Sequence, residues 1–202
     1  GHDRYNPTSG VVTGNTKVTM TGGLISHNVY GGGAMSNVGL SHAGVNSGES
    51  GHTHIIISGG QVGLEKAAQG EVHSVGGGSV FGGSKGLALD TVNQHPEWSL
   101  MANVNQTYIT VKGDAKIMSS VYGGSQMGRV LENTSVKIQE NAEIGSNIDI
   151  LPTTGNPTRD SLALHRGHVF GGGSGNYSVI CYHPNSTTDI DSIWRNRAAG
   201  QV

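Results

Sequence analysis

A valine, an aromatic residue and two glycines stand together four times in this chain of 202 residues. The copies are VYGGG at 29–33, VFGGS at 80–84, VYGGS at 121–125 and VFGGG at 169–173. Four matches to so specific a pattern indicate an internal repeat, and a repeat has to be recognised first because it decides the whole fold. We therefore expect the chain to be built from similar units.

A threonine followed by alternating apolar residues precedes each copy. These segments begin at Thr16, Thr53, Thr107 and Thr134. Apolar residues two positions apart predict a strand with one buried face. Stacking the four strands predicts two inward columns, one of Val18, Ile55, Ile109 and Val136 and one of Met20, Ile57, Val111 and Ile138. The four threonines would form a ladder whose members hydrogen-bond or pack along the stack.

The third repeat, from Thr107 to the next equivalent threonine, Thr134, is the most regular. It contains three candidate short strands, at 108–112, 116–118 and 120–122, separated by glycine and polar turns. Short strands repeated every 20 to 50 residues or so are typical of a solenoid. The prediction is an all-β fold, a single-stranded parallel β-helix with three sides, in which each coil hydrogen-bonds to the next about 4.8 Å away.

The composition agrees with a narrow solenoid core. Only 34% of the residues are hydrophobic, and 34 of the 202 are glycine, whereas ordinary glycine usage is about 7%. Glycine suits the corners between short strands because it permits positive φ and close backbone approach. The five prolines and the lack of a G-X-Y period exclude collagen-like and proline-rich classes.

Charge and hydropathy exclude several partners. Charged residues make up 13% of the chain and nearly balance, at a net −2, so no nucleic-acid-binding stripe or polybasic membrane patch is expected. No apolar run approaches the roughly 20 residues that span a bilayer. The single cysteine, Cys181, has no partner for an internal disulfide.

The unequal spacing of the repeats, which start near residues 16, 53, 107 and 134, indicates insertions at corners. We predict an N-terminal flank over 1–11, a repeat domain over 12–180 and a C-terminal flank, a candidate cap, over 181–202. The insertions are expected at about 40–51, 64–78, 87–105 and 146–167, and insertions of this kind often carry binding function. The chain opens without an initiating methionine or a signal peptide, so we expect it to be a piece of a longer protein.

The sequence VYGGSQMGRVLENTSVKI at 121–138 resembles the glycine-rich repeats of large surface β-helix proteins of Bacteroidota-type bacteria. The resemblance extends from Val12 to Asn176 and is best in the third and fourth copies. It implies a right-handed β-helix that is exported and is either secreted or held at the outer cell surface. The O-glycosylation pattern of such bacteria, Asp followed by Ser or Thr and an apolar residue, gives three candidates, Thr91, Ser161 and Ser192. The alternative is chance occurrence in serine-rich loops.

Two kinds of ligand site, a phosphate-binding loop and a metal site, are alternative explanations of residues in the repeat. The glycine runs are not phosphate loops, because no lysine followed by serine or threonine completes the motif. His52 and His54, two positions apart on a predicted strand, face the same side as a metal site requires. No cysteine or carboxylate pair completes such a site, so the favoured interpretation is two surface histidines without a metal. No cofactor is expected.

Catalysis by a β-helix on carbohydrate needs clustered carboxylates, or acids that bind calcium beside a base. The carboxylates of this chain are scattered singly. The densest ionisable group lies in the last predicted insertion and contains Asp160, His165 and His168. A two-carboxylate mechanism there would need an acid from another coil, and the favoured interpretation is a solvated loop.

The aromatic residues of the repeat form a predicted column of Tyr30, Phe81, Tyr122 and Phe170. If these side chains point inward, they are a core or corner stack, which is the favoured interpretation. If they point outward with the valines inside, they form a flat strip that would bind sugar rings.

The leading functional hypothesis is a non-enzymatic cell-surface or secreted β-helix module, an adhesin or stalk segment that binds glycans or host or envelope proteins. This hypothesis is based on the repeats and on the lack of a concentrated catalytic cluster in the sequence. One alternative is a polysaccharide-degrading β-helix enzyme, a lyase or hydrolase. Another is a structural component of an envelope assembly. The extracellular space or the bacterial outer cell surface is the expected location.

Overall fold

The computed structural model describes residues 9–39, 50–63, 78–87, 101–145 and 167–175, together with the backbone of 179–182 and 190–194. Every regular element in these ranges is a β-strand, which confirms the all-β prediction. Among these residues no helix is long and apolar enough to cross a membrane.

The strands fall into four layers that follow one another along the chain. Layer 1 contains β1 (Thr16–Met20), β2 (Leu24–Ile25) and β3 (Val29–Tyr30). Layer 2 contains β4 (His52–Ile57), β5 (Gln61–Val62) and β6 (Val80–Phe81). Layer 3 contains β7 (Asn103–Val104), β8 (Gln106–Val111), β9 (Lys116–Ile117) and β10 (Val121–Tyr122). Layer 4 contains β11 (Arg129–Val130), β12 (Thr134–Ile138), β13 (Glu143–Ile144) and β14 (Val169–Phe170).

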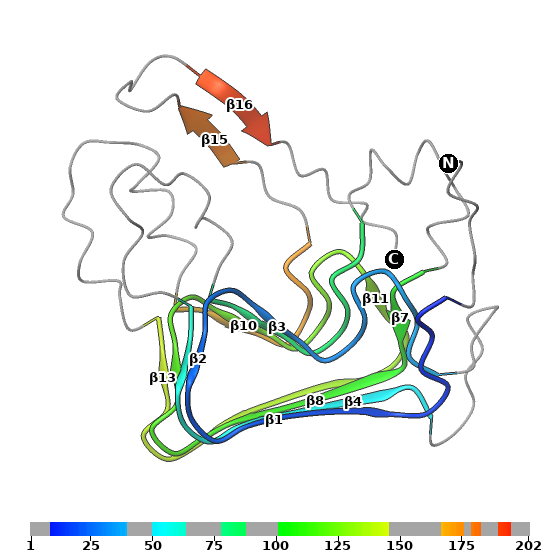
Figure 1. The fold of residues 1–202 in the computed structure, drawn as a ribbon, viewed down its shortest axis with the longest axis horizontal. Coiled ribbons are helices and arrows are strands. Elements are labelled where there is room, and N and C mark those ends of the chain that lie inside the picture. The colour runs from blue at the N-terminus through cyan, green and yellow to red at the C-terminus, as the bar shows by residue number, and fades with distance from the viewer. Residues whose placement is uncertain are drawn as a thin grey trace.

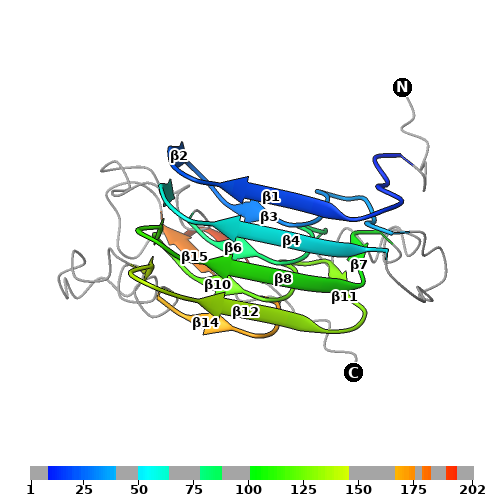
Figure 2. The same ribbon diagram turned by 90° about the horizontal axis from the view of Figure 1, so that it is seen from below.

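Each layer contributes one strand to each of three four-stranded parallel sheets. We call these the long sheet (β1-β4-β8-β12), the short sheet (β2-β5-β9-β13) and the aromatic sheet (β3-β6-β10-β14). Figure 1 looks along the stack, so strands of different layers overlap, and Figure 2 shows the layers one below another. Strands β7 and β11 form a further parallel pair, and β15 (Val179–Tyr182) pairs antiparallel with β16 (Ile190–Trp194).

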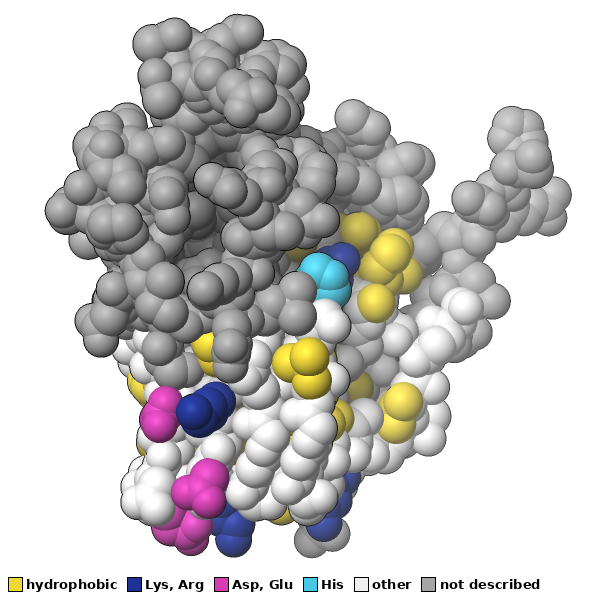
Figure 3. Space-filling model, turned by 60° about the vertical axis from the view of Figure 1, so that its left-hand side comes forward, with side chains coloured by type: hydrophobic (Ala, Val, Ile, Leu, Met, Phe, Trp, Pro, Cys, Tyr) yellow, Lys and Arg dark blue, Asp and Glu magenta, His cyan; other side chains and the backbone are white. Residues whose placement is uncertain are grey.

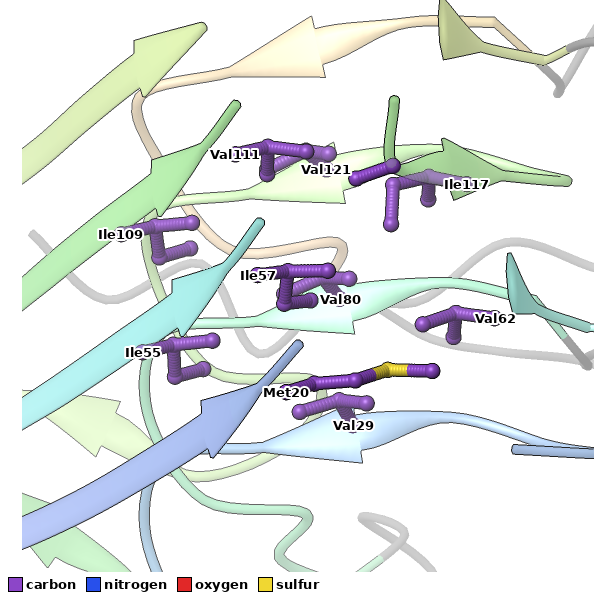
Figure 4. Packing of buried hydrophobic residues seen from close by; sticks show 11 residues of the cluster. Met20, Val29, Ile55, Ile57, Val62, Val80, Ile109, Val111, Ile117 and Val121 are labelled. Carbon is purple, nitrogen blue, oxygen red and sulfur yellow. The ribbon is translucent and has the colours of Figure 1, made fainter. Parts of the chain in front are cut away.

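The register of the long sheet confirms both predicted columns. Val18 pairs with Ile55, Ile55 with Ile109 and Ile109 with Val136, and the second column runs in the same way from Met20 to Ile138. The inward side chains of the long sheet pack against those of the other two sheets, such as Val62 and Val80 (Figure 4). Alternating burial along β4 and β8 follows directly from the strand period of two.

Two inward positions are better covered at layer 1 than at layer 4. Met20 is 6% exposed and Val29 is 5% exposed, whereas their layer 4 counterparts Ile138 and Val169 are 38% and 48% exposed. Figure 4 shows the Met20 side chain extended beside Val29. The expectation that Ile138 is a core residue is therefore wrong for this structure. No described residue lies on the far side of layer 4 to cover that side chain.

The four threonines bond across their own layers, and Thr53 also lies 3.5 Å from the Gln106 carbonyl of the next layer. Each hydroxyl donates to the carbonyl of the first glycine that follows the aromatic residue of its own layer. The pairs are Thr16 with Gly31, Thr53 with Gly82, Thr107 with Gly123 and Thr134 with Gly171, at 2.5 to 2.6 Å. These bonds tie the start of the long sheet to the end of the aromatic sheet in every layer.

The three strands expected in the third repeat correspond to β8, β9 and β10, with ends that differ by one or two residues. The predicted insertions lie mostly outside the described residues. An exception is 103–104, inside the predicted insertion at 87–105, which forms strand β7 and pairs with β11. Strand β15 runs across the predicted boundary between 180 and 181.

Candidate functional site

The glycine pair after each aromatic residue is where neighbouring layers approach most closely. A Cβ atom added to Gly31, Gly82 or Gly123 would lie less than 3.0 Å from the carbonyl oxygen of the equivalent glycine one layer on. Real Cβ atoms do not adopt such separations. Glycine is thus required here by close backbone approach, and the repeat motif is explained by stacking without any ligand.

The aromatic column is a continuous stack of four rings. Centroids of successive rings from Tyr30 to Phe170 are 5.1, 4.9 and 5.1 Å apart and the rings are within 12° of parallel. Three of the adjacent valines, Val29, Val80 and Val121, lie in the core cluster, so by the strand period the rings point to the other side of the sheet. Phe81 and Tyr122 are nonetheless only 3% and 6% exposed.

This geometry combines features of the two interpretations of the column. The valines are inside, as the sugar-binding strip requires, but the rings stack on one another. Both faces of Phe81 and Tyr122 are covered by neighbouring rings. A sugar ring that stacks on an aromatic face would find only the outer faces of Tyr30 and Phe170 at the two ends.

Tyr30 anchors the layer 1 end of the column through its hydroxyl. The hydroxyl donates to Gln126 Oε1 at 2.6 Å and accepts from Asn28 Nδ2 at 3.2 Å. Asn28 Oδ1 in turn accepts from the Ser79 backbone N–H. Burial raises the pKa of Tyr30, which keeps the phenol protonated as the donor in this network.

The outward side chains of the long sheet form a second cluster, which we call the outer face. Lys17, His54 and Tyr108 are register neighbours on three adjacent strands. The His54 and Tyr108 rings stack in parallel at 4.8 Å, and the His52 ring meets Tyr108 edge-on at 6.0 Å. His52 and His54 thus share one face, as their spacing predicted.

The electrostatics of the outer face favour neutral imidazole. Burial lowers the pKa of His54, and the nearby His52 and Lys17 lower it further. The His52 backbone N–H donates to Asn15 Oδ1 at 2.9 Å, while its Nε2 is buried without a hydrogen-bond partner. No group of three histidine, cysteine or acidic side chains that could hold a metal occurs among the described residues.

Polar side chains extend the outer face along layers 3 and 4. The Tyr108 hydroxyl donates to Gln106 Oε1, and Gln106 Nε2 donates to Glu132. This chain of three polar groups and the stacked His54 ring were not identified from the sequence. The available signal was the outward position of Tyr108, two residues after Gln106 on a strand whose alternate residues are buried.

The candidate catalytic group is only partly within the described residues. Asp160 and His165 lie outside them. His168 is exposed, and its ring lies 5.5 Å from that of Phe170. Among the described acids, Glu132, Glu140 and Asp114 each accept a hydrogen bond from a neutral amide group.

The glycosylation candidates fall mainly outside the described residues. Thr91 and Ser161 lie there, and Ser192 belongs to β16, opposite Cys181. Figure 3 shows the side of the molecule next to the short sheet, where acidic and basic side chains lie close together and no large patch of one sign forms. Lys116 of β9 and Glu143 of β13, for example, are register neighbours in that sheet.

Comparisons with protein-family models, with curated proteins and with solved structures found no match to this chain.

Proposed function

We propose that this chain is a right-handed, three-sided parallel β-helix module of an exported or cell-surface protein, and that it acts as a non-enzymatic scaffold for binding glycans or proteins. The observation that supports it most is the continuity of the columns through four layers in three sheets. A stack of this kind is rigid along its axis and offers long surfaces to partners.

The outer face is the proposed contact surface. It brings an ammonium group, two imidazoles and a phenol together on flat, regular strands, from Lys17 across His54 to Tyr108. The exposed Lys17 ammonium suits the carboxylate groups of an acidic glycan. Tyr108 is 37% exposed, so its ring edge and hydroxyl are accessible from solvent.

Binding of the full chain to a panel of neutral and uronic-acid polysaccharides tests this surface. Substituting Tyr108→Ala removes the ring on which His54 stacks, and we expect at least a tenfold loss of affinity for an acidic glycan. Lys116→Ala is the matched control, because Lys116 is exposed on the short sheet and makes no contact with the outer face. Equal affinities for both variants and the unaltered chain would exclude the outer face as the contact surface.

The absence of catalysis has its own test. The same polysaccharides are incubated with the unaltered chain and with the variants Asp160→Asn and His168→Gln, and new reducing ends or unsaturated products are measured. The scaffold role predicts no turnover by any of the three. Turnover that disappears in either variant would refute the non-enzymatic role in favour of a degrading enzyme.

Location is tested by labelling intact cells of the source organism with an antibody raised against the chain. The proposal predicts labelling without permeabilisation or recovery of the protein from the medium. Labelling that requires permeabilised cells, with none in the medium, would refute export.

A further inference from the structure

Among the described residues, no steric contact and no positive φ requires Gly171, the first glycine of the layer 4 pair, to be glycine. Its counterparts Gly31, Gly82 and Gly123 each face the carbonyl oxygen of the next layer at less than 3.0 Å from where a Cβ would lie. In the part of the chain that the structure describes, a Cβ on Gly171 would have nothing within 4 Å. Gly171 is also not among the residues with positive φ. The glycine would be required only if another backbone lay beneath layer 4.

The second glycine of the pair shows the same pattern. A Cβ on Gly32, Gly83 or Gly124 would lie less than 3.0 Å from an atom of the next layer, whereas Gly172 has nothing within 4 Å. Layer 4 therefore keeps both glycines of the motif, and neither meets a steric constraint in this structure.

The opposite end of the stack has a matching position at Gly22. Its counterpart Gly59, which also lacks a positive φ, faces the layer before it, where a Cβ would lie 2.7 Å from the Thr21 carbonyl oxygen. Gly113 faces the Ser58 carbonyl oxygen in the same way but also has a positive φ. A Cβ on Gly22 would have nothing within 4 Å, and Gly22 has no positive φ. Layer 1 thus has a glycine that fits a layer above it, and layer 4 has glycines that fit a layer below it.

Hydrogen bonding and apolar exposure at layer 4 point the same way. The N–H groups of Gly31, Gly82 and Gly123 donate to the carbonyl of the aromatic residue one layer on, at 2.7 to 3.0 Å. Among the described residues Gly171 has no equivalent acceptor. Phe170 is 42% exposed, although the two middle rings of its column are buried. An exposed strand edge beside exposed apolar side chains is a surface suited to pairing with another chain.

We propose that a second copy of this chain stacks on the first head to tail, so that layer 1 of one copy lies against layer 4 of the other. The contact repeats the interface that already joins the four layers within one chain. Phe170 would stack on Tyr30 of the second copy, and Ile138 would be covered by Met20 of the second copy. The Gly171 N–H would donate to the Tyr30 carbonyl of the second copy, and Gly22 of the second copy would face the Gln139 carbonyl.

Charge favours this arrangement over pairing of two layer 4 ends. Layer 4 carries three exposed acids, Glu132, Glu140 and Glu143, and two exposed cations, Arg129 and Lys137, so its described charges sum to −1. Two layer 4 ends brought together would therefore repel weakly. The described part of layer 1 carries the exposed Lys17 and no acid. Because the two contacting surfaces differ, the association is open-ended and yields linear chains of copies.

This inference deepens the proposed scaffold role and rests on it, but its test uses neither a glycan nor a polysaccharide substrate. Self-association of the full chain is measured by sedimentation velocity at protein concentrations from about 1 to 200 µM. The dissociation constant obtained is converted to a free energy of association. The unaltered chain is expected to form dimers and longer species as concentration rises. If the chain binds glycan but does not self-associate, the stacking proposal alone is overturned. If the chain self-associates but does not bind glycan, the proposed contact surface alone is overturned.

Two single-methyl substitutions test the direction of stacking. Gly171→Ala blocks the layer 4 end and Gly22→Ala blocks the layer 1 end, and each should weaken self-association at least tenfold. Neither Cβ atom would lie within 4 Å of the described part of the chain, so circular dichroism and the unfolding midpoint measured at low concentration should match those of the unaltered chain. Lys116→Ala, on an outward position of layer 3, should associate normally.

Mixing the two glycine variants gives the decisive result. Each has one intact end, and the intact ends are complementary, so an equimolar mixture should form a one-to-one dimer and no longer species. A monomeric unaltered chain at the highest concentration would overturn the proposal. Association that is weakened by Gly171→Ala and unchanged by Gly22→Ala would also overturn it, in favour of pairing between two layer 4 ends.

Discussion

The close approach of the glycine corners makes a specific prediction for Gly82, which lies in the middle of the stack. In the variant Gly82→Ala the added Cβ would lie less than 3.0 Å from the Gly123 carbonyl oxygen and from the Thr107 Cβ. Neither neighbour is the end of a flexible side chain. Layers 2 and 3 must therefore separate locally to admit one methyl group.

The cost of Gly82→Ala can be built from its parts. Overpacking a well-packed interior costs about 1 to 3 kcal/mol. Separation also strains the buried bond from the Gly82 N–H to the Tyr122 carbonyl, which is 2.8 Å long, and an unsatisfied buried group costs about 1 to 3 kcal/mol. The lower entropy of the unfolded alanine chain returns about 0.4 to 1 kcal/mol. The expected net loss is about 1 to 5.6 kcal/mol, a large share of a typical stability of about 5 to 15 kcal/mol.

Urea unfolding followed by circular dichroism measures this loss. With a slope of roughly 2 to 3 kcal/mol/M, the midpoint of Gly82→Ala should fall by about 0.3 to 3 M. Gly171→Ala is the matched control, because it adds the same methyl group to the same motif with nothing within 4 Å. At low protein concentration its midpoint should not move. Equal effects of the two substitutions would refute the layer-contact explanation of the glycine motif.

Two further predictions concern side chains of the long sheet. Thr107→Val removes a buried hydroxyl and leaves a glycine carbonyl without its donor. Unfolding experiments should show a loss of about 1 to 3 kcal/mol in the free energy of unfolding. Thr134→Val, at an exposed position, should lose much less. For His54, burial and then the neighbouring His52 and Lys17 side chains lower the pKa below the ordinary 6.5. The unfolded chain therefore takes up the proton first as pH falls, so stability present above pH 6.5 declines as the pH drops toward the lower folded-state pKa. His54→Gln should flatten that part of the stability profile measured between about pH 5 and 8, and an unchanged slope would contradict this.

Much of the layer pattern could be predicted from the sequence, because it depends on local periodicities. Alternation after each threonine placed Ile55 and Ile57 on one face, and the repeat placed them beside Ile109 and Val111. The same reasoning failed for Ile138. Its burial depends on whether another layer lies beneath it, and a pattern within one repeat carries no information about the layer beyond.

The candidate site was less predictable, for two physical reasons. The threonine hydroxyls bond to glycine carbonyls at the far end of the same layer, as Thr53 does with Gly82 across 29 positions. The number of residues between the two partners depends on the length of the insertion between them, and the periodicity of the strands does not predict that length. The His54 ring stacks on Tyr108 of another strand, and this contact follows from inter-strand register, which the threonine ladder predicted but which was not applied to outward residues.

Stacking energetics connect the open end of the fold to its proposed association. In a repeat protein each layer is stabilised by its contacts with the layers on either side. Layers 2 and 3 have two such neighbours, whereas layers 1 and 4 have one each among the described residues. Layer 1 compensates with Met20, which is almost buried, but Ile138 and Val169 leave layer 4 apolar and exposed. A second copy adds the missing interface to layer 4 without any change in the chain, so stability of that layer should rise with protein concentration.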